Sequence, residues 1–362
     1  MNNIWDEDKL YSFLRRYVDL CARRSFRRVE VVGQLPDLSD GAWLFIANHT
    51  HTLMDALVIL QLRHEPTAFG ARADVFRNPT AAKFLRFCKM VPLGRKGRDS
   101  EEEVSRNAGT LMEIDRVLEH GVPFCLFPEG RHRPMHSLMP FHRGAASMGF
   151  RSAAKRPTHI LPIGLEYSDW FHYRGHVRVT LGEPVDMNAF AASLPEGIDD
   201  SARDYELQNE LQERVASLIF YLPDDETYAG RLAYAEGIRK KMPMALCIIL
   251  GALSFPFFLL SSVLTAPLWA CAEIICSGIK DRAWHNTVRF GIRLVGTPLW
   301  GLILAVLLFV FLPWWAAALL LLYYLPSYSI FYDWLNLITA RLVPPLPPTL
   351  ARPQVMRARH RA

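Results

Sequence analysis

The chain has 362 residues with a formal net charge of +5, and 51% of its residues are hydrophobic, slightly more than a soluble protein usually carries. This length is sufficient for two domains, or for one domain with an appended module. The six cysteines include no Cys-x-x-Cys pair, which excludes the usual zinc spacing and favours a reducing compartment over a disulfide framework. The start of the chain, MNNIWDEDKLY, is acidic and no apolar run follows it, so it lacks the pattern of a secretory signal peptide.

Residues 1–40 are predicted to form a basic amphipathic lead. Arginines stand at positions 15, 16, 23, 24, 27 and 28, and the apolar residues among them recur every three or four positions, which predicts an amphipathic helix. A basic helix of this kind is suited to an anionic membrane surface. A solvated helix held by salt bridges is the alternative, and the apolar C-terminal part of the chain favours the membrane surface.

Residues 41–222 are predicted to form an α/β domain. Short apolar runs alternate with segments of helical spacing, which predicts a mostly parallel sheet flanked by helices. A last amphipathic stretch, residues 205–222, closes the domain. The expected strands are residues 42–48, 67–72, 90–94, 122–127, 159–167 and 176–182, and the expected helices before the last one are residues 53–64, 81–88, 101–121 and 144–155.

The rest of the chain divides into a linker at 223–241 and a membrane-embedded helical region with a basic tail at 242–362. Two stretches of this region, 242–272 and 294–332, contain no charged residue. Each is longer than the roughly 20 apolar residues that one membrane-spanning helix needs. We therefore expect both stretches to lie in a lipid bilayer.

Each apolar stretch has a proline near its middle, Pro256 in the first and Pro313 in the second. One interpretation is two long, tilted, proline-kinked helices. The other is two helical hairpins that turn at the proline and return to the same face. Crossing helices would translocate the basic segment 273–293, whereas hairpins keep it with the other basic flanks, as the positive-inside rule prefers.

Two histidines and an aspartate follow the first expected strand, in NHTHTLMD (48–55). Ligands of open α/β sheets bind at such strand ends. A histidine there can accept a proton from a substrate hydroxyl if a carboxylate holds its other ring nitrogen. Asp55 is placed to serve His51, one helical turn earlier, or His49 if residues 49–52 form a loop. The spacing alone does not choose between them.

Two further strand ends carry cations. FPEG (127–130) breaks into a Pro-Glu-Gly turn surrounded by Arg131, Arg133, Arg143 and three histidines, and a turn of this kind can wrap a phosphate or a carboxylate. The third strand end, VPLGRKGR, contributes Arg95, Lys96 and Arg98. A His/Asp pair with converging cations indicates group-transfer chemistry on an anionic substrate.

These blocks resemble, in the same order, those of the glycerophospholipid acyltransferases, the superfamily that includes lysophosphatidate and glycerol-3-phosphate acyltransferases. The resemblance covers roughly residues 25–185. NHTHTLMD is similar to the first block, VPLGR to the second, FPEG with the later FHRGAA to the third, and LPIGLEY to the fourth. The first and third blocks, at about this separation, are the specific ones.

The resemblance implies an O-acyl transfer in which His49, directly after Asn48, is the general base and Asp55 orients it. The donor that it implies is an acyl thioester of coenzyme A or of acyl carrier protein, with no metal and no organic cofactor. Arg95, Glu129 and Gly130 are implied to hold the glycerol-phosphate end of the acceptor. The full set of implied substrate-binding residues is Asn48, Arg95, Phe127, Pro128, Glu129, Gly130, Arg131 and Arg143.

Two features depart from the commonest pattern of the family. Five residues separate His49 from Asp55 where four are usual, and a subset of the family resembles this longer form. We therefore expect an extra loop residue, while the helical register of His51 with Asp55 keeps His51 as an alternative base. After FPEG the chain continues with RHR instead of Thr-Arg, so we expect Arg131 or Arg133 to replace that arginine.

Three other functions fit part of the sequence. A zinc hydrolase would use the histidines at 49, 51, 132, 136 and 142, but no HExxH or comparable spacing occurs. A non-catalytic membrane adaptor would need neither the His/Asp pair nor the FPEG turn. A transacylase that moves acyl chains between phospholipids fits the same motifs and needs no thioester.

The sequence thus predicts an integral membrane acyltransferase of phospholipid synthesis or remodelling. We expect it to acylate lysophosphatidate, another lysophospholipid or glycerol 3-phosphate. The catalytic domain is expected on the cytoplasmic face, at the inner membrane if the protein is bacterial. Membrane phospholipid and the acyl donor are the expected partners, and no nucleic acid is expected. Acyl-chain preference and oligomeric state are left open.

Overall fold

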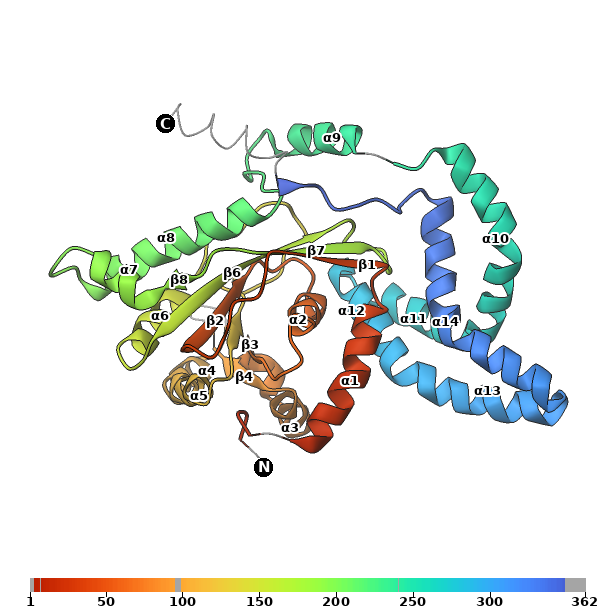
Figure 1. Ribbon diagram of the computed structural model, residues 1–362, viewed down its shortest axis with the longest axis horizontal. Helices are drawn as coiled ribbons and strands as arrows, with labels where there is room; N and C mark the ends of the chain where they lie inside the picture. Colours follow the sequence, from red (N-terminus) through yellow and green to blue (C-terminus); the bar gives the residue numbers. More distant parts are fainter. Residues whose placement is uncertain (1–2, 7, 95–98, 240, 349–362) are drawn as a thin grey trace.

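A computed structural model describes residues 3–6, 8–94, 99–239 and 241–348 of the chain. They form an α/β part, built around one sheet, and a helical part that lies against one side of it (Figure 1). The strands are β1 (Arg28–Val32), β2 (Ala42–Ala47), β3 (Ala68–Arg72), β4 (Met90–Leu93), β5 (Phe124–Leu126), β6 (Thr158–Tyr167), β7 (His176–Leu181) and β8 (Val185–Asp186). The helices up to residue 238 are α1 (Lys9–Arg23), α2 (Leu53–Leu60), η1 (Ala73–Phe76), α3 (Pro79–Phe87), α4 (Glu101–Ser105), α5 (Asn107–Glu119), α6 (Gly144–Ala153), α7 (Met187–Ser193), α8 (Asp200–Leu218) and α9 (Tyr228–Ile238).

The sheet is mixed, with a parallel centre. Its strand order is β1-β7-β6-β2-β5-β3-β4, and β8 lies beside β6. The strands from β6 to β4 run parallel to one another, β7 and β8 pair with β6 in the antiparallel sense, and β1 runs parallel to β7. The predicted fold class, a mostly parallel sheet flanked by helices, is confirmed, and each expected strand is present.

Both faces of the sheet are buried, which explains the continuous apolar runs of its central strands. In β2, Leu44 and Ile46 point into the hydrophobic cluster that α5, α6 and α8 cover, whereas Trp43 and Phe45 point into the cluster that α1 and α2 cover. Successive residues of a strand alternate between faces in this way. Because β2, β5 and β6 are parallel, the residues that follow each of them gather at one edge of the sheet.

The sheet begins earlier in the chain than the sequence predicts. Residues 28–32, which the sequence assigns to the N-terminal lead, form β1, whose Val29 and Val31 lie opposite Val177 and Val179 of β7. The strand lies at the sheet edge and is half exposed, so its apolar signal is short. The basic helix before it forms as expected, as α1.

The prediction of a linker at 223–241 is wrong in one part, because α9 forms within it. Ala235 of this helix packs with Phe220, Leu222 and Leu346 in a small buried cluster. Tyr228 and Leu232 of the same helix are partly buried against this cluster, at helical spacing with Ala235. Only three positions in two turns carry the pattern, which explains why the helix was not expected.

The apolar region contains α10 (Met244–Leu264), α11 (Ala266–Ser277), η2 (Arg282–Trp284), α12 (His285–Gly291), the π-helical turn η3 (Ile292–Gly296), α13 (Thr297–Phe311) and α14 (Trp314–Ile338). Within the described part of the chain, three helices are long and apolar enough to cross a membrane: Met244–Leu264, Arg282–Phe311 and Trp314–Ile338. Helix α11 is apolar but shorter. Most side chains of the long helices are not buried by protein, which is compatible with association with a membrane.

The two prolines of the apolar stretches behave differently. Pro256 lies inside α10, which continues to Leu264, so the expected turn at this proline is wrong. Pro313 separates α13 from α14, so the second stretch does turn at its proline. Pro313 directly precedes α14, where a proline loses no helical hydrogen bond, whereas Pro256 removes one hydrogen bond from the interior of α10.

The basic segment between the two stretches lies against the α/β part, where α12 approaches α2 (Figure 1). Asp281 of this segment pairs with His132 at 2.7 Å. A segment translocated across a bilayer from the α/β part could not make this contact. In the structure this segment lies on the same side as the α/β part. On this point the structure agrees with the hairpin interpretation.

Candidate active site

The candidate site begins where β2 ends, at the turn that leads into α2. The Asn48 side chain extends the sheet: its Nδ2 donates to the carbonyl oxygen of Leu165 at 2.9 Å, and its Oδ1 accepts from the Leu165 N–H at 2.7 Å. This amide is buried, and both of its ends are used on β6. The sequence places Asn48 among the substrate-binding residues, whereas these contacts make it the residue that fixes the start of the turn.

Asp55 is the centre of the turn. Its Oδ2 lies 2.8 Å from Nδ1 of His49 and accepts the backbone N–H groups of Thr50 at 2.9 Å and His51 at 2.7 Å. Its Oδ1 accepts the hydroxyl of Tyr167 at 2.6 Å. Burial pushes the pKa of Asp55 upward, but the hydrogen bonds and charge of its partners outweigh it and hold the pKa below its ordinary value. Asp55 is therefore an ionised carboxylate that orients His49.

The His49 ring is held by its neighbours and remains partly open to solvent. It stacks on Phe127 with ring centroids 4.4 Å apart and meets His132 edge-on at 5.8 Å. Its side chain is 18% exposed, whereas Asp55 is fully buried. An ionised Asp55 holds the proton on Nδ1, so Nε2 is the basic nitrogen of this ring. A base oriented by a buried carboxylate is the arrangement that deprotonates a hydroxyl.

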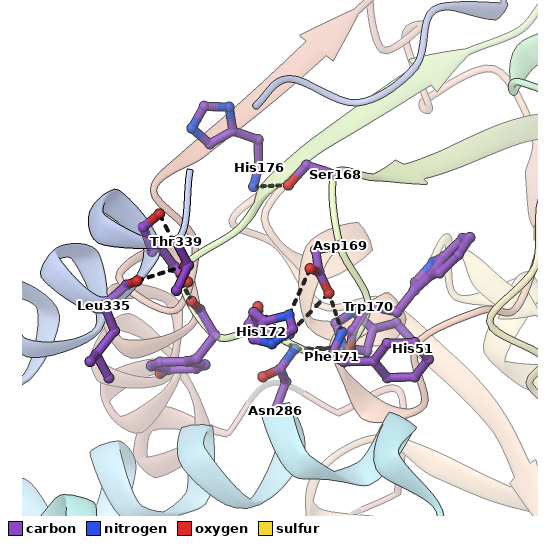
Figure 2. Close-up of polar contacts among 12 residues, drawn as sticks. His51, Ser168, Asp169, Trp170, Phe171, His172, His176, Asn286, Leu335 and Thr339 are labelled. Atoms are coloured by element: carbon purple, nitrogen blue, oxygen red, sulfur yellow. Dashed lines mark hydrogen bonds and ion pairs between the residues drawn. The ribbon is translucent and has the colours of Figure 1, made fainter. Parts of the chain in front are cut away.

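His51 occupies a different environment. Its side chain is buried, and its Nε2 accepts a hydrogen bond from Nδ2 of Asn286 at 3.0 Å (Figure 2). Its ring packs edge-on against Tyr167, and burial lowers the pKa of His51 to about 4. Only its backbone N–H reaches Asp55. The geometry answers the question that the spacing left open: His49, and not His51, pairs with Asp55 through its ring.

Glu129 of the FPEG turn ties two loops together. Its Oε1 accepts the backbone N–H of His49 at 2.8 Å, and its Oε2 accepts the backbone N–H of Met139 at 3.0 Å. Burial raises the pKa of Glu129 to about 7, against the pull of these hydrogen bonds. The sequence places Glu129 at the acceptor, whereas both of its oxygens here hold backbone groups of the site.

Gly130 is required by the shape of the same turn. Its φ is +67°, a value that residues with a side chain rarely adopt, and a Cβ at this position would lie 3.0 Å from the ring of His142. Pro128 is buried, and its carbonyl oxygen accepts the backbone N–H of His142 at 2.8 Å. The FPEG turn thus positions Phe127 under His49 and Glu129 beneath the backbone of the histidine turn.

Two of the predicted cations lie close to the histidine turn. The backbone N–H of Arg133 donates to the carbonyl oxygen of His49 at 3.0 Å, and its guanidinium pairs with Asp224 at 2.5 Å. Arg131 is exposed, and its Nε points at the sulfur of Met139. The chain after FPEG therefore brings the backbone of Arg133 to His49, while the guanidinium of Arg133 is bound to Asp224 and Ser137.

The other predicted cations do not join them in the described structure. Arg143 donates to the hydroxyl of Ser201 at 2.6 Å, at the start of α8. This contact serves the packing of α8 and not the histidine turn. Arg95 lies outside the described residues, as do Lys96 and Arg98. The cation set at the site is thus represented by Arg131 and Arg133.

The three histidines after FPEG have separate surroundings. His132 pairs with Asp281, Nδ1 of His136 lies 2.9 Å from Glu166, and His142 packs against Gly130. Among the described residues, no group of three or more histidine, cysteine, aspartate or glutamate side chains is placed to hold a metal ion.

The sequence did not predict that the apolar region would reach this site. Asp281, Asn286 and Thr287 contact His132, His51 and Thr52 respectively. The available signal was the run of polar residues 285–287 between two charge-free stretches. Tyr167 was also missed as a partner of Asp55, although it ends the LPIGLEY block.

Comparison with known proteins agrees with this geometry. Residues 28–166 match the family model described as Acyltransferase, a range that runs from β1 almost to the end of β6 and includes His49, Asp55 and Glu129. This region of the chain therefore carries an acyltransferase domain, in agreement with the resemblance of the sequence blocks to the glycerophospholipid acyltransferases. Among solved structures, the 1-acyl-sn-glycerophosphate (LPA) acyltransferase PlsC from Thermotoga maritima is similar, at 23% sequence identity, covering 58% of this chain and 80% of that chain, with a TM-score of 0.42.

Proposed function

We propose that this protein is a membrane acyltransferase that moves a fatty acyl chain from a thioester to the hydroxyl of a lysophospholipid, with lysophosphatidate first and glycerol 3-phosphate second as acceptor. The observation that carries the proposal is the chain of hydrogen bonds from Tyr167 through buried Asp55 to the partly exposed ring of His49. The family match supports acyl transfer, and the exposed guanidinium of Arg131, directly after the FPEG turn, supports an acceptor that carries a phosphate.

In the proposed step, Nε2 of His49 takes the proton of the acceptor hydroxyl. The hydroxyl oxygen attacks the thioester carbonyl, the carbon–sulfur bond breaks, and the thiolate recovers the proton from His49, so that ester and free thiol are the products. The imidazolium formed on the way is stabilised by the Asp55 carboxylate 2.8 Å from its Nδ1. No metal or organic cofactor takes part in this scheme.

Thiol release from acyl-CoA by detergent-purified protein tests the proposal, with lysophosphatidate, glycerol 3-phosphate or no acceptor. We expect release that depends on an acceptor and equals the ester formed. Acyl carrier protein replaces coenzyme A in a second series, which identifies the donor. Esterification of the lysolipid from a labelled phospholipid with no thioester present would contradict the proposed donor and support a transacylase.

Helix α1 supports a site at the membrane interface. One side of the helix faces the protein: Tyr11, Cys21 and Ala22 are buried there, as is Arg15, which donates to the carbonyl oxygens of Leu60 and Arg63. The other side carries exposed apolar residues, with Phe13 73% exposed. The other exposed apolar residues of α1 are Leu10, Leu14, Tyr17 and Leu20, flanked by exposed arginines at 16, 23 and 24. An exposed apolar strip with basic flanks is suited to an anionic lipid surface.

The surface of α1 joins that of the longest apolar helix. The Tyr17 hydroxyl donates to the carbonyl oxygen of Leu294 at 2.8 Å, and the neighbouring Val295 and Leu299 are exposed. Both surfaces therefore meet the same bilayer in the proposed arrangement. The acceptor and the product reside in that bilayer, and a site at its surface finds them at high effective concentration.

The substitution Phe13→Glu tests the role of α1. We expect the KM for a long-chain lysolipid in vesicles to rise by about tenfold, because one buried aromatic side chain is lost from the interface. The KM for a short-chain, water-soluble acceptor should not change. Tyr205→Glu on α8 is the matched control, since Tyr205 is 54% exposed and lies far from α1 (Figure 1). Equal effects of both variants would rule out a specific role for α1.

A further inference from the structure

The segment that joins α11 to α13, residues 281–293, is called the clamp segment here. It comes from the apolar region, but it packs on the acyltransferase domain beside the histidine turn, where α12 lies next to α2 (Figure 1). It contacts three loops of that domain, which follow β2, β5 and β6. No part of the scheme for acyl transfer above uses it.

The clamp segment holds the histidine turn through side chains. The Thr52 hydroxyl lies 2.8 Å from the Thr287 hydroxyl and 3.3 Å from the carbonyl oxygen of Ala283. The residue before Thr287, Asn286, binds the residue before Thr52: its Nδ2 donates to Nε2 of His51 at 3.0 Å. Two consecutive residues of the turn between His49 and Asp55 are therefore bound by the apolar region.

Thr52 is the strained residue of this turn. Its φ is +50°, a value that glycine adopts easily but that is rare for a residue with a branched Cβ such as threonine. Thr52 lies directly before α2, in the five-residue stretch where the commonest family pattern has four. The longer connection thus fits between β2 and α2 with one residue in an unfavourable conformation, and the clamp segment binds the side chain of that residue.

The conformation of the turn determines which groups donate hydrogen bonds to Asp55. The backbone N–H groups of Thr50 and His51 both point at Oδ2 of Asp55, the same oxygen that binds His49. If Thr52 relaxed to a negative φ, these two N–H groups would turn away from the carboxylate. Asp55 and His49 would then lose their fixed mutual geometry.

Other contacts keep the clamp segment in place. Asn286 also donates to the carbonyl oxygen of Trp170 at 3.1 Å, and Figure 2 shows it pointing into the loop that carries Trp170 and His172. Asp281 pairs with His132 at 2.7 Å, and the Arg282 guanidinium lies over the ring of Phe171. The segment is therefore fixed at both its start and its middle.

We propose that Thr287 and Asn286 are positioning residues for the His49–Asp55 pair, so that the acyltransferase site is complete only when the apolar helices are docked on the domain. The proposal rests on the proposed function, since it assigns His49 and Asp55 to the reaction. Neither Thr287 nor Asn286 contacts the reacting atoms. They act through Thr52 and His51, which set the backbone around Asp55.

The substitution Thr287→Val keeps the shape of the side chain and removes its hydroxyl. We expect kcat to fall by about 10- to 100-fold, because small misplacements of a catalytic pair have effects of this size, while the KM of both substrates stays unchanged. Thr287→Ser restores the hydroxyl and should restore kcat. Thr265→Val is the matched control: Thr265 is buried in the same helical region, and its hydroxyl bonds only within its own helix, to Ser261.

Amide hydrogen exchange of residues 48–55 gives a readout that does not need activity. Thr287→Val should reduce protection of the Thr50 and His51 amides, and Thr265→Val should not. If wild type has no acyltransferase activity, the proposed function fails while exchange still tests the clamp. Unchanged exchange in Thr287→Val, an unchanged kcat, an equal loss in Thr265→Val, or no rescue by Thr287→Ser would each overturn the proposal.

Discussion

The substitution His49→Ala is expected to lower kcat by about a thousandfold, within the range that general-base residues contribute. The substitution removes the imidazole whose Nδ1 lies 2.8 Å from Asp55, while the fold keeps its contacts because the His49 side chain is partly exposed. His51→Ala should lower kcat less, by about 10- to 100-fold, because it breaks the positioning contact with Asn286 but keeps the backbone N–H that reaches Asp55. Acyl transfer under saturating donor and acceptor measures both.

The His51 variant also controls for loss of stability. It deletes a buried ring and leaves Asn286 without its acceptor, so its thermal midpoint should fall more than that of His49→Ala. An inactive His51→Ala beside an active His49→Ala would move the base to His51. It would also contradict the observed geometry, in which Nε2 of His51 already accepts a hydrogen bond from Asn286.

Asp55→Asn is expected to lower kcat by roughly 10²- to 10³-fold with a small change in fold. The amide can place its oxygen where Oδ2 now accepts three N–H groups and direct its NH₂ at the Tyr167 hydroxyl oxygen, so three hydrogen bonds are kept and the one to Tyr167 is reversed in direction. What is lost is the negative charge that stabilises protonated His49. The matched variant Tyr167→Phe removes one hydrogen bond and keeps the charge, and we expect it to lose less than about tenfold.

The pH dependence of stability checks the charge state of Asp55. Because its pKa is depressed in the folded chain, its ionised form stabilises the fold above the unfolded pKa of about 4, and this contribution disappears as the pH falls through the folded value. The thermal midpoint of Asp55→Asn should therefore differ most from wild type near neutral pH. The two midpoints should approach each other below about pH 4. A difference that grows on acidification would mean that Asp55 is protonated in the native protein.

Two carboxylates of the site have different tasks because their surroundings differ. Asp55 receives four donors, among them the His49 ring, and stays ionised despite full burial. Glu129 receives two backbone N–H groups, and burial dominates its pKa. Glu129 therefore joins the histidine turn to the loop at Met139, while Asp55 would stabilise the charge that His49 acquires in the proposed reaction.

The α/β fold could be predicted from local sequence patterns. Strand and helix periods are properties of neighbouring residues, and the central strands are apolar throughout because both faces of the sheet are covered. The edge strand β1 and the helix α9 escaped prediction because each buries only a few side chains. Pro256 and Pro313 look alike in the sequence, yet only one begins a new helix, since the choice depends on what surrounds the backbone.

The sequence by itself determined the acyltransferase motifs, the order of their blocks, the apolar region and the pairing of a histidine with Asp55. The spacing of the residues left the choice between His49 and His51 open, and the resemblance to the family implied His49. The tertiary structure gives the physical reason, because His51 is buried and bonded to Asn286, a residue more than two hundred positions away in the chain. The same holds for the clamp segment. Its contacts with Thr52 arise when the apolar helices pack on the domain, and no pattern of neighbouring residues encodes such a long-range contact.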